Sequence, residues 1–515
     1  MLGITPQQWK KELPEFKEKT DLFYAGEMNK KDYKGFSGKF GSYAQRSGDA
    51  SMLRLRMPGG QVTKEKLKFI ADSIDKHGVT MAHLTTCQTI QLHNLKPEAL
   101  YDIMEGALDA GIVTIGGGGD FPRNVMVSPL SGVEKGEYFD VFPWAKAVGE
   151  YLLTLINDRK MPRKLKVGFS NGPANLTHAT FRDLGFAARP DKTFDVYSAG
   201  GLGANPKMGL KVGEKVSPDQ VLYYVRAMWE TFITYGNYEN RGKARTRYMQ
   251  DALGQEEYKK AFQEKLQGVY DSGVDLKIEA EERKLEKTGD GVAVKDKRAV
   301  AQKQDGLYAV FYHPIGGTPQ IGKFRQLYEA IKDAKGAELR LCPDESMYII
   351  NLNGTEAKRV LEATDDGAKT LFETSVACVG ASICQVGVRD SQHLLHMAVE
   401  AVRKAGLKEE SLPQIHISGC PSSCGTHQIG VIGFHGGVKV IDKVPNPSFT
   451  LHLYGQDRQG EERFGTQMGV ILEKDIPDFL VEAGKAAEHS GKSFQEWSQA
   501  NPGALEEIAK KYLVK

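Results

Sequence analysis

The sequence lacks the features of membrane proteins and of secreted proteins. It has no run of about 18 apolar residues, so no segment is predicted to span a bilayer. The N-terminal stretch MLGITPQQWKKELPEFKEK carries acids and has no apolar core of signal-peptide length, so we expect a cytoplasmic protein. Cysteine is scarce, with six in 515 residues, which is too few for a scaffold held together by disulfides.

A strong net charge is also missing. The 68 Lys and Arg residues nearly balance the 66 Asp and Glu residues, and the net charge of +2 gives no bulk electrostatic reason to expect nucleic-acid binding. The glycines of SAGGLGAN (198–205) stand without the rest of a dinucleotide-binding motif. What remains is an ordinary globular composition, with 40% hydrophobic residues, on a chain long enough for several domains.

The sequence does contain an internal repeat. Residues 57–94 and 313–351 each read as a Gly-Gly turn, an amphipathic helix that ends at a glycine (Gly78 or Gly336) and two strand-like runs, at an offset of 257 or 258 residues. PRKLKVGFSN (162–171) and PQIHISGCPS (413–422) form a second pair at an offset of 251. These offsets far exceed solenoid periods, so they predict duplication of a whole module. Chance recurrence of a Gly-Gly turn before a helix is the alternative.

Four of the six cysteines form two close pairs on glycine-rich loops. VACVGASICQVG holds Cys378 and Cys384, and ISGCPSSCGTHQIG holds Cys420 and Cys424. The five-residue gap of the first pair is loose for structural zinc, and disulfides are disfavoured in the cytoplasm. Thiolates that converge from two such loops suit a [4Fe–4S] cluster. The spacing therefore favours a cluster, with zinc and unrelated core cysteines as open alternatives.

Cations gather in apolar or glycine-rich, strand-like contexts of the first half. Strand alternation places Lys164 and Lys166 on one face. Each cation could also be an ordinary solvated surface residue. The cations in these contexts are Arg54 and Arg56 in SMLRLRMPGG, Arg123 in GGGGDFPRNVMV, and Arg163, Lys164 and Lys166 in MPRKLKVGFSN.

GCPSSCG with the C-x5-C and C-x3-C pairs, together with LRLRMPGG, PRNV and PRKLK in this order, resembles the ferredoxin-type sulfite and nitrite reductases from about residue 40 to 500. The resemblance implies siroheme and a [4Fe–4S] cluster as cofactors. It implies that Cys378, Cys384, Cys420 and Cys424 ligate the cluster, and that Cys424 bridges it to the siroheme iron. It also implies that an anion is bound by Arg54, Arg123, Lys164 and Lys166.

Siroheme carries eight carboxylates, so the resemblance implies further polar contacts at its rim. Cys87, in TTCQTIQLHN, stands where the family has an arginine. We expect Cys87 to be a small side chain beside the haem, with another cation or water taking the place of that arginine; a reactive thiol and a plain core residue are the alternatives. The candidate rim contacts are Arg56, Thr85, Thr86, Gln88, Gln91, Arg163, Arg245 and Arg247.

The expected fold class is α+β with a duplicated, pseudo-two-fold architecture: two ferredoxin-like half-modules and two larger cofactor-binding domains. The linker is rich in charge, and the arm has few periodic signals. The predicted parts are an N-terminal arm (1–45), ferredoxin-like half-domain 1 (46–112), a siroheme- and substrate-binding domain with the basic residues (113–271), a linker (272–304), ferredoxin-like half-domain 2 (305–368) and a domain that ligates the cluster and siroheme (369–515).

The resemblance implies six-electron reduction of sulfite or nitrite. The Lys164-Leu165-Lys166 pattern favours sulfite, a larger and doubly charged anion, with nitrite as the alternative. No flavin or nicotinamide module is attached, so electrons are expected from a separate protein, a ferredoxin first and an NADPH-dependent flavoprotein second. From other classes, a zinc-stabilised nucleic-acid-binding protein and a haem-storage or electron-transfer protein remain as hypotheses.

Overall fold

Two ferredoxin-like sheets, one from each half of the chain, have the same strand order and share one core. The computed structural model describes residues 5–515. In each sheet, neighbouring strands are antiparallel. The first sheet runs in the order β1 (Ser42–Ala44), β2 (Ser51–Arg56), β5 (Thr89–Leu95) and β4 (Met81–Leu84); the second runs β11 (Ala299–Ala301), β12 (Tyr308–Tyr312), β14 (Met347–Leu352), β13 (Glu338–Leu341) and β3 (Gln61–Val62).

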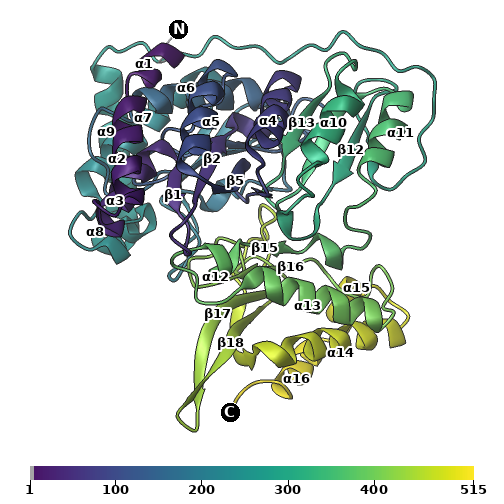
Figure 1. Ribbon diagram of the computed structural model, residues 1–515. Helices are drawn as coiled ribbons and strands as arrows, with labels where there is room; N and C mark the ends of the chain where they lie inside the picture. Colours follow the sequence, from purple (N-terminus) through teal and green to yellow (C-terminus); the bar gives the residue numbers. More distant parts are fainter. Residues whose placement is uncertain (1–4) are drawn as a thin grey trace.

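The short strand β3 joins the two half-domains. It belongs to the first half of the chain but pairs with β13 of the second, with Val62 opposite Leu339. Helices cover these sheets and pack against each other across the halves, as Figure 1 shows for α4 and α10. The helices of this region are α4 (Lys64–His77), α5 (Pro97–Asp109), α10 (Lys323–Ile331) and α11 (Gly354–Ala363).

The predicted repeat is present in this region. Each copy has a left-handed glycine in the Gly-Gly turn, Gly59 at φ 65° and Gly316 at φ 64°, followed by a helix and two strands. Gly78 ends α4 in the left-handed conformation, as predicted. The prediction for Gly336 was wrong, because α10 already ends at Ile331. Turns follow that helix, and they continue the buried apolar stripe without helical backbone.

The two larger sheets repeat a second topology. In each, two parallel pairings are followed by two antiparallel pairings. The strands are β6 (Met126–Val127), β7 (Val167–Ser170), β8 (Leu184–Ala188), β9 (Phe194–Ser198) and β10 (Leu210–Val216), then β15 (Val376–Ala377), β16 (Ile415–Ser418), β17 (Ile432–Ile441), β18 (Val444–Leu453) and β19 (Thr466–Leu472). The accompanying helices are α6 (Phe142–Thr154), α7 (Val221–Tyr235), α8 (Met249–Leu253) and α9 (Gln255–Asp271), then α12 (Gly380–Ile383), α13 (Ser391–Lys404), α14 (Ile476–His489), α15 (Phe494–Ala500) and α16 (Ala504–Lys510).

This second repeat corrects the predicted alignment. The equivalent strands β7 and β16 begin at residues 167 and 415, which are 248 residues apart, whereas PRKLKVGFSN and PQIHISGCPS align at 251. Lys164 and Lys166 therefore precede β7, whereas Cys420 and Cys424 follow β16. Short apolar stretches fit equally well at nearby offsets, and only strand pairing fixes the register.

The N-terminal region is more regular than its sequence predicts. Beyond residues 1–4, which lie outside the described part, it forms α1 (Pro6–Lys10), α2 (Leu13–Tyr24) and α3 (Lys30–Ser37). Leu13 and Phe16, one turn apart on α2, are buried in the core shared by the half-domains. Two or three buried side chains are enough to hold such a short helix, which explains the weak periodic signal.

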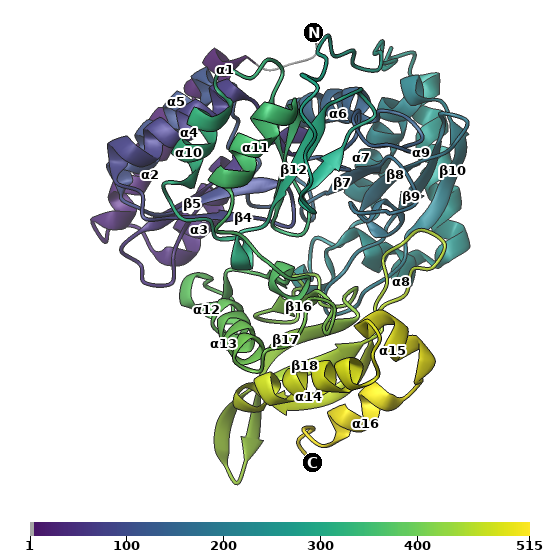
Figure 2. The same cartoon turned by 90° about the vertical axis from the view of Figure 1, so that its right-hand side faces the viewer.

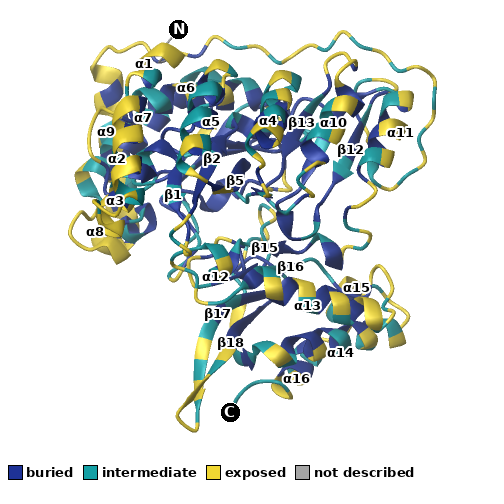
Figure 3. Cartoon of the chain, in the orientation of Figure 1, coloured by how far each residue is buried: buried dark blue, intermediate teal, exposed yellow. Residues whose placement is uncertain are grey.

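Residues 272–298 contain no helix or strand and run over the outside of the molecule from α9 toward the second half-domain (Figure 1). The last domain lies below the rest in both views, with the β17–β18 hairpin extending away from the body (Figures 1 and 2). The outer end of this hairpin is exposed, whereas the centres of the sheets are buried (Figure 3). No helix in residues 5–515 is both long and apolar enough to cross a bilayer.

Candidate functional site

The four paired cysteines meet at one edge of the last sheet. Cys378 follows β15 and Cys420 follows β16, and these strands are parallel neighbours, so their carboxyl ends lie together. The backbone N–H of Gly419 donates to Cys378 Sγ at 3.2 Å. Burial raises the pKa of the Cys424 thiol, and the nearby thiols of Cys420 and Cys384 raise it further. The structure thus brings both predicted pairs into one group.

The spacing of the sulfurs argues against a single zinc ion. Four sulfurs around tetrahedral zinc lie about 3.8 Å apart, given Zn–S bonds of about 2.3 Å. In the described part of the chain, the only set of three or more His, Cys, Asp or Glu ligand atoms within 4.8 Å of one another is made of histidines. The cysteine sulfurs are more widely spread, which suits the larger [4Fe–4S] cluster.

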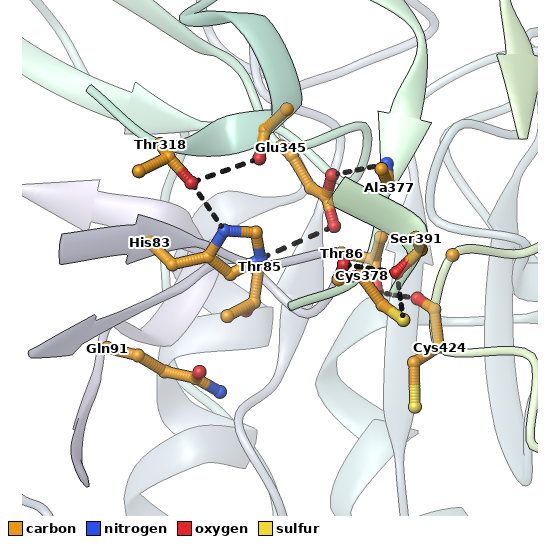
Figure 4. A network of polar contacts seen from close by, with 12 residues as sticks. His83, Thr85, Thr86, Gln91, Thr318, Glu345, Ala377, Cys378, Ser391 and Cys424 are labelled. Atoms are coloured by element: carbon orange, nitrogen blue, oxygen red, sulfur yellow. Dashed lines mark hydrogen bonds and ion pairs between the residues drawn. The ribbon is translucent and has the colours of Figure 1, made fainter. Parts of the chain in front are cut away.

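Residues of the first half hold the cysteine loops from outside. Arg46 donates from Nε to the Cys384 carbonyl at 3.2 Å and from Nη2 to the Gly387 carbonyl at 2.6 Å. Thr86 Oγ1 donates to the Cys424 carbonyl at 2.9 Å, a contact drawn in Figure 4. No sequence pattern points to Arg46, because its role depends on loops more than 330 residues away.

A buried network of polar side chains links both halves of the chain to the loop that carries Cys378 (Figure 4). His83 on β4 lies 3.5 Å from Glu345, which accepts a hydrogen bond from the backbone N–H of Ala377 at 2.9 Å. Burial raises the pKa of the Glu345 carboxyl well above its usual range and lowers the pKa of His83 to about 3, with Arg54 adding to the latter shift. Both shifts disfavour the charged forms, so burial weakens the ion-pair character of this contact.

Two of the predicted anion-binding residues share one anchor. Arg54 Nη1 and Arg123 Nη1 donate to the carbonyl of Gly117 at 2.5 and 2.9 Å, and Arg123 Nη2 donates to Gly119 at 2.7 Å. Oriented by its neighbours, the Gln91 amide oxygen accepts from Arg54 Nη2 at 2.6 Å. Burial lowers the pKa of Arg123 to about 10, and the Arg54 charge contributes. The two guanidinium groups are held side by side without a carboxylate between them.

The two predicted lysines lie close enough to Cys424 to lower the pKa of its thiol. Burial drives the pKa of Lys164 well below its usual range, and the charges of Arg245, Lys166 and Arg123 lower it further, while Cys424 raises it. Burial also lowers the pKa of Lys166. The structure therefore brings Lys164 and Lys166 to the thiol that the family resemblance places between cluster and haem.

Cys87 lies within this cationic group. Lys166 Nζ donates to Cys87 Sγ at 3.1 Å. Burial alone would raise the pKa of the thiol, but Lys166, Arg182 and Arg54 together lower it to about 6. These cations favour the thiolate form of Cys87, which supports the alternative of a reactive thiol, and its place beside the haem remains a prediction. The nearby cations fit the expectation that another cation replaces the family arginine.

Several predicted rim contacts are occupied with protein groups. Arg56 is buried and donates to the carbonyls of Ile115 and Arg123 at 2.8 and 3.1 Å. Gln88 is also buried, and its amide binds the backbone of Val127 and the carbonyl of Leu341 at 2.7–2.9 Å. These two side chains brace the half-domains against the larger domain, which leaves them few groups for a cofactor.

The other rim candidates lie nearer the surface of the site. Thr85 accepts from the backbone N–H groups of Cys87 and Thr89 and so shapes the turn that carries Thr86. Arg163 pairs with Asp120 at 2.6 Å, and its rim role remains a prediction.

Arg245 lies near Lys164 and Lys166, and Arg247 lies near Arg245. Arg245 pairs with Asp183 at 2.9 Å, and Arg247 donates from Nε to the Asn205 carbonyl at 2.6 Å. Asp183 is fully buried and also accepts from the backbone N–H of Lys166 at 2.8 Å. Sequence reasoning missed Asp183 and its neighbour Arg182, although both lie directly before β8.

The buried hydrogen-bond donors at this site outnumber the protein acceptors that they can reach. Three buried guanidinium nitrogens, Nε of Arg123, Nε of Arg245 and Nη1 of Arg247, have no hydrogen-bond partner within residues 5–515. Buried polar groups are rarely left without partners, so these donors indicate a missing anionic group. A macrocycle with many carboxylates and a small anion on it would satisfy them. The residues present therefore fit siroheme beside a thiolate-bound cluster.

Comparisons with known proteins agree with this fit. The family described as the nitrite/sulfite reductase ferredoxin-like half domain matches residues 43–110, and the nitrite and sulphite reductase 4Fe-4S domain matches residues 118–269. The second match falls on the first copy of the large domain, which contains no cysteine; the four paired cysteines are in the second copy.

Relatives of both activities are similar over most of the chain. The sulfite reductase [NADPH] hemoprotein beta-component of Oceanobacillus iheyensis is 25% identical and aligns over 86% of this chain and 85% of its own. The ferredoxin–nitrite reductase of Synechococcus elongatus is 27% identical over 83% and 84%. The solved structure of the Mycobacterium tuberculosis NirA protein has the same fold, with a TM-score of 0.77 at 22% identity over 95% and 94% of the two chains. The chain belongs to the sulfite and nitrite reductase family, with siroheme and a [4Fe–4S] cluster as its cofactors.

Proposed function

We propose that this protein reduces sulfite to sulfide in a six-electron reaction, with nitrite reduction to ammonia as the alternative. The observation that carries the proposal is the group of cations around Lys164 and Cys424. Burial and neighbouring positive charge depress the pKa of Lys164, and no carboxylate is among the groups that act on it. A buried group of like charges that outnumbers its counter-ions is costly unless an anion joins it.

The basic residues would divide the work. Arg54 and Arg123 are fixed by backbone carbonyls and would hold the anion and stabilise negative charge on its departing oxygens. Lys164 and Lys166 would supply protons, because burial brings their pKa values down toward neutrality, whereas arginine keeps its proton more firmly. The siroheme and cluster, when bound by Cys378, Cys384, Cys420 and Cys424, would supply the electrons.

The excess of positive charge at the site favours sulfite over nitrite. The site combines the predicted cations with Arg182 and Arg245, which act on Lys166. A doubly charged anion gains more from this excess than a singly charged one does. The Cys87 thiolate offsets one positive charge, and Asp183, which pairs with Arg245, offsets another, so the preference is a matter of degree. Because the chain has no complete dinucleotide motif, we propose a separate protein as the donor, a ferredoxin first.

Steady-state reduction of both anions by the purified protein, with a chemically reduced viologen as donor, tests the proposal. We expect a siroheme absorption spectrum, iron for one cluster and one haem, and a higher kcat/KM for sulfite. A higher kcat/KM for nitrite would replace the substrate assignment with its alternative. A haem-loaded protein that reduces neither anion would point to haem storage or electron transfer, and a colourless zinc-loaded protein would point to the zinc-binding class.

A further inference from the structure

Three histidines converge on the sheet face opposite the apolar core of the last domain. His435 on β17 and His452 on β18 alternate with Phe434 and Leu451, which are buried in that core. His427 comes from the turn that follows the second cysteine loop. The three ring centroids are 4.9, 4.9 and 5.0 Å apart, an almost equilateral triangle. One ring nitrogen from each lies within 4.8 Å of the others.

The hydrogen bonds of these rings leave nitrogen atoms free to bind something else. His435 Nδ1 and His452 Nε2 are 2.8 Å apart and share a single proton. His452 Nδ1 is buried and has no hydrogen-bond partner in the described chain. His427 Nδ1 contacts Ser418 Oγ at 3.0 Å, which fixes that ring as an outer-shell partner fixes a metal ligand.

The rings are also in the protonation state that metals require. Burial lowers the pKa of His435 to about 4, and the His452 ring adds to the shift. Burial, followed by the neighbouring rings, lowers the pKa of His427 well below its usual range, and burial lowers that of His452. No carboxylate is among the groups that act on these three pKa values. An imidazolium ion would therefore be unfavourable here, whereas neutral imidazole is the ligand form for zinc.

We propose that His427, His435 and His452 bind a divalent first-row transition metal ion, with Zn²⁺ as the reference ion and water in the fourth position. Nitrogens around tetrahedral zinc lie about 3.3 Å apart, so the widest pair must close by at most about 1.5 Å. The ion takes the place of the proton between His435 and His452, and that proton moves through solvent to the other nitrogen of the same ring, so both imidazoles stay neutral. His435 is partly exposed and provides the route of entry.

A metal here would fasten the turn after Cys424 to the β17–β18 hairpin. Gly425 N–H and His427 Nδ1 both contact Ser418 Oγ, so the histidine site and the cysteine loop share one anchor. The ion would stabilise the holoprotein through its binding free energy, without taking part in the reaction.

Equilibrium dialysis of the cofactor-loaded protein against Zn²⁺, followed by elemental analysis, tests the proposal. Loaded cysteines cannot take up zinc, so we expect one zinc per chain in addition to the iron. His435→Ala and His427→Ala should lose this zinc and the associated rise in Tm, whereas His396→Ala, an exposed histidine on α13, should keep both.

Iron content and the haem spectrum serve as separate readouts. We expect them to be unchanged in His435→Ala, which distinguishes failure of this site from failure of the proposed reductase. Absence of zinc uptake by the wild type, or equal uptake by wild type and His435→Ala, would overturn the proposal.

Discussion

The charge state of Cys87 is the sharpest prediction at the site. Lys166, Arg182 and Arg54 lower the pKa of this thiol from 9.0 to about 6, against the effect of burial. At pH 7 about 90% of Cys87 is then thiolate, compared with about 1% for an unperturbed thiol. The opposite charge of Lys166 lies 3.1 Å away, and such a neighbour shifts a pKa by about 1–3 units. We therefore expect Lys166→Gln to raise the pKa of Cys87 by that amount.

The same shift contributes to stability with a defined sign. A thiol with a depressed folded-state pKa stabilises the protein above its unfolded pKa and loses this contribution as pH falls from 9 through 6. At about 1.36 kcal/mol per pKa unit, the contribution is about 1.4 kcal/mol at pH 7 and approaches about 4 kcal/mol above pH 9. Cys87→Ser should remove this part of the pH dependence of unfolding.

Alkylation of the siroheme-free protein by iodoacetamide, followed by mass spectrometry of the peptide that contains Cys87, measures the pKa. The readout is specific to this peptide, so the other thiols do not enter it, and burial keeps the pKa of Cys342 well above its usual range. The rate should rise with a midpoint near pH 6 in the wild type and in Lys192→Gln, a control lysine outside the site. A wild-type midpoint near 9, or no change in Lys166→Gln, would refute the electrostatic reasoning.

Five further substitutions test other parts of the site. Lys166→Asn should shift the ratio of kcat/KM from sulfite toward nitrite; an unchanged ratio would count against the charge argument. Cys424→Ser should abolish magnetic coupling between haem and cluster, measured by EPR or Mössbauer spectroscopy, and intact coupling would disprove the ligand assignment. Asp183→Asn should lower the unfolding free energy by about 3 kcal/mol because it leaves buried cations unpaired, whereas Asp120→Asn, in a more exposed pair, should cost less than about 1 kcal/mol. Gln88→Ala should cost about 3 kcal/mol in a denaturation experiment by leaving buried backbone groups unpaired; a loss under about 1 kcal/mol would contradict its bracing role.

The features that the sequence predicts well are local ones. The Gly-Gly turn, the helix and the two strands of each half-domain depend on periodicity and turn chemistry within 40 residues, and Gly59 and Gly316 have the conformation that their turns require. The cysteine group was predicted because a cluster needs ligands on flexible loops with recognisable spacing. Its ligand roles and those of the basic residues remain predictions.

The features that the sequence does not predict depend on contacts between distant segments. The pairing of β3 with β13 joins residues 277 positions apart, and Arg46 reaches a carbonyl 338 positions away. Arg56 illustrates the same limit, because a cation in a strand looks the same in sequence whether it binds a cofactor or, as here, two backbone carbonyls. Asp183 was missed because one acid before a strand carries no pattern.

The duplication places unlike ends of equivalent strands at the site. Lys164 and Lys166 precede β7, whereas Cys420 and Cys424 follow β16, so neither set has a counterpart at the same position in the other copy. The site therefore arises only where the two copies meet. Hydrogen bonds such as that from Thr86 to the Cys424 carbonyl hold the two copies together at the site. Weakening these hydrogen bonds should lower turnover and leave the iron content unchanged. Such a result would show that they hold the two copies together and are not needed for cofactor binding.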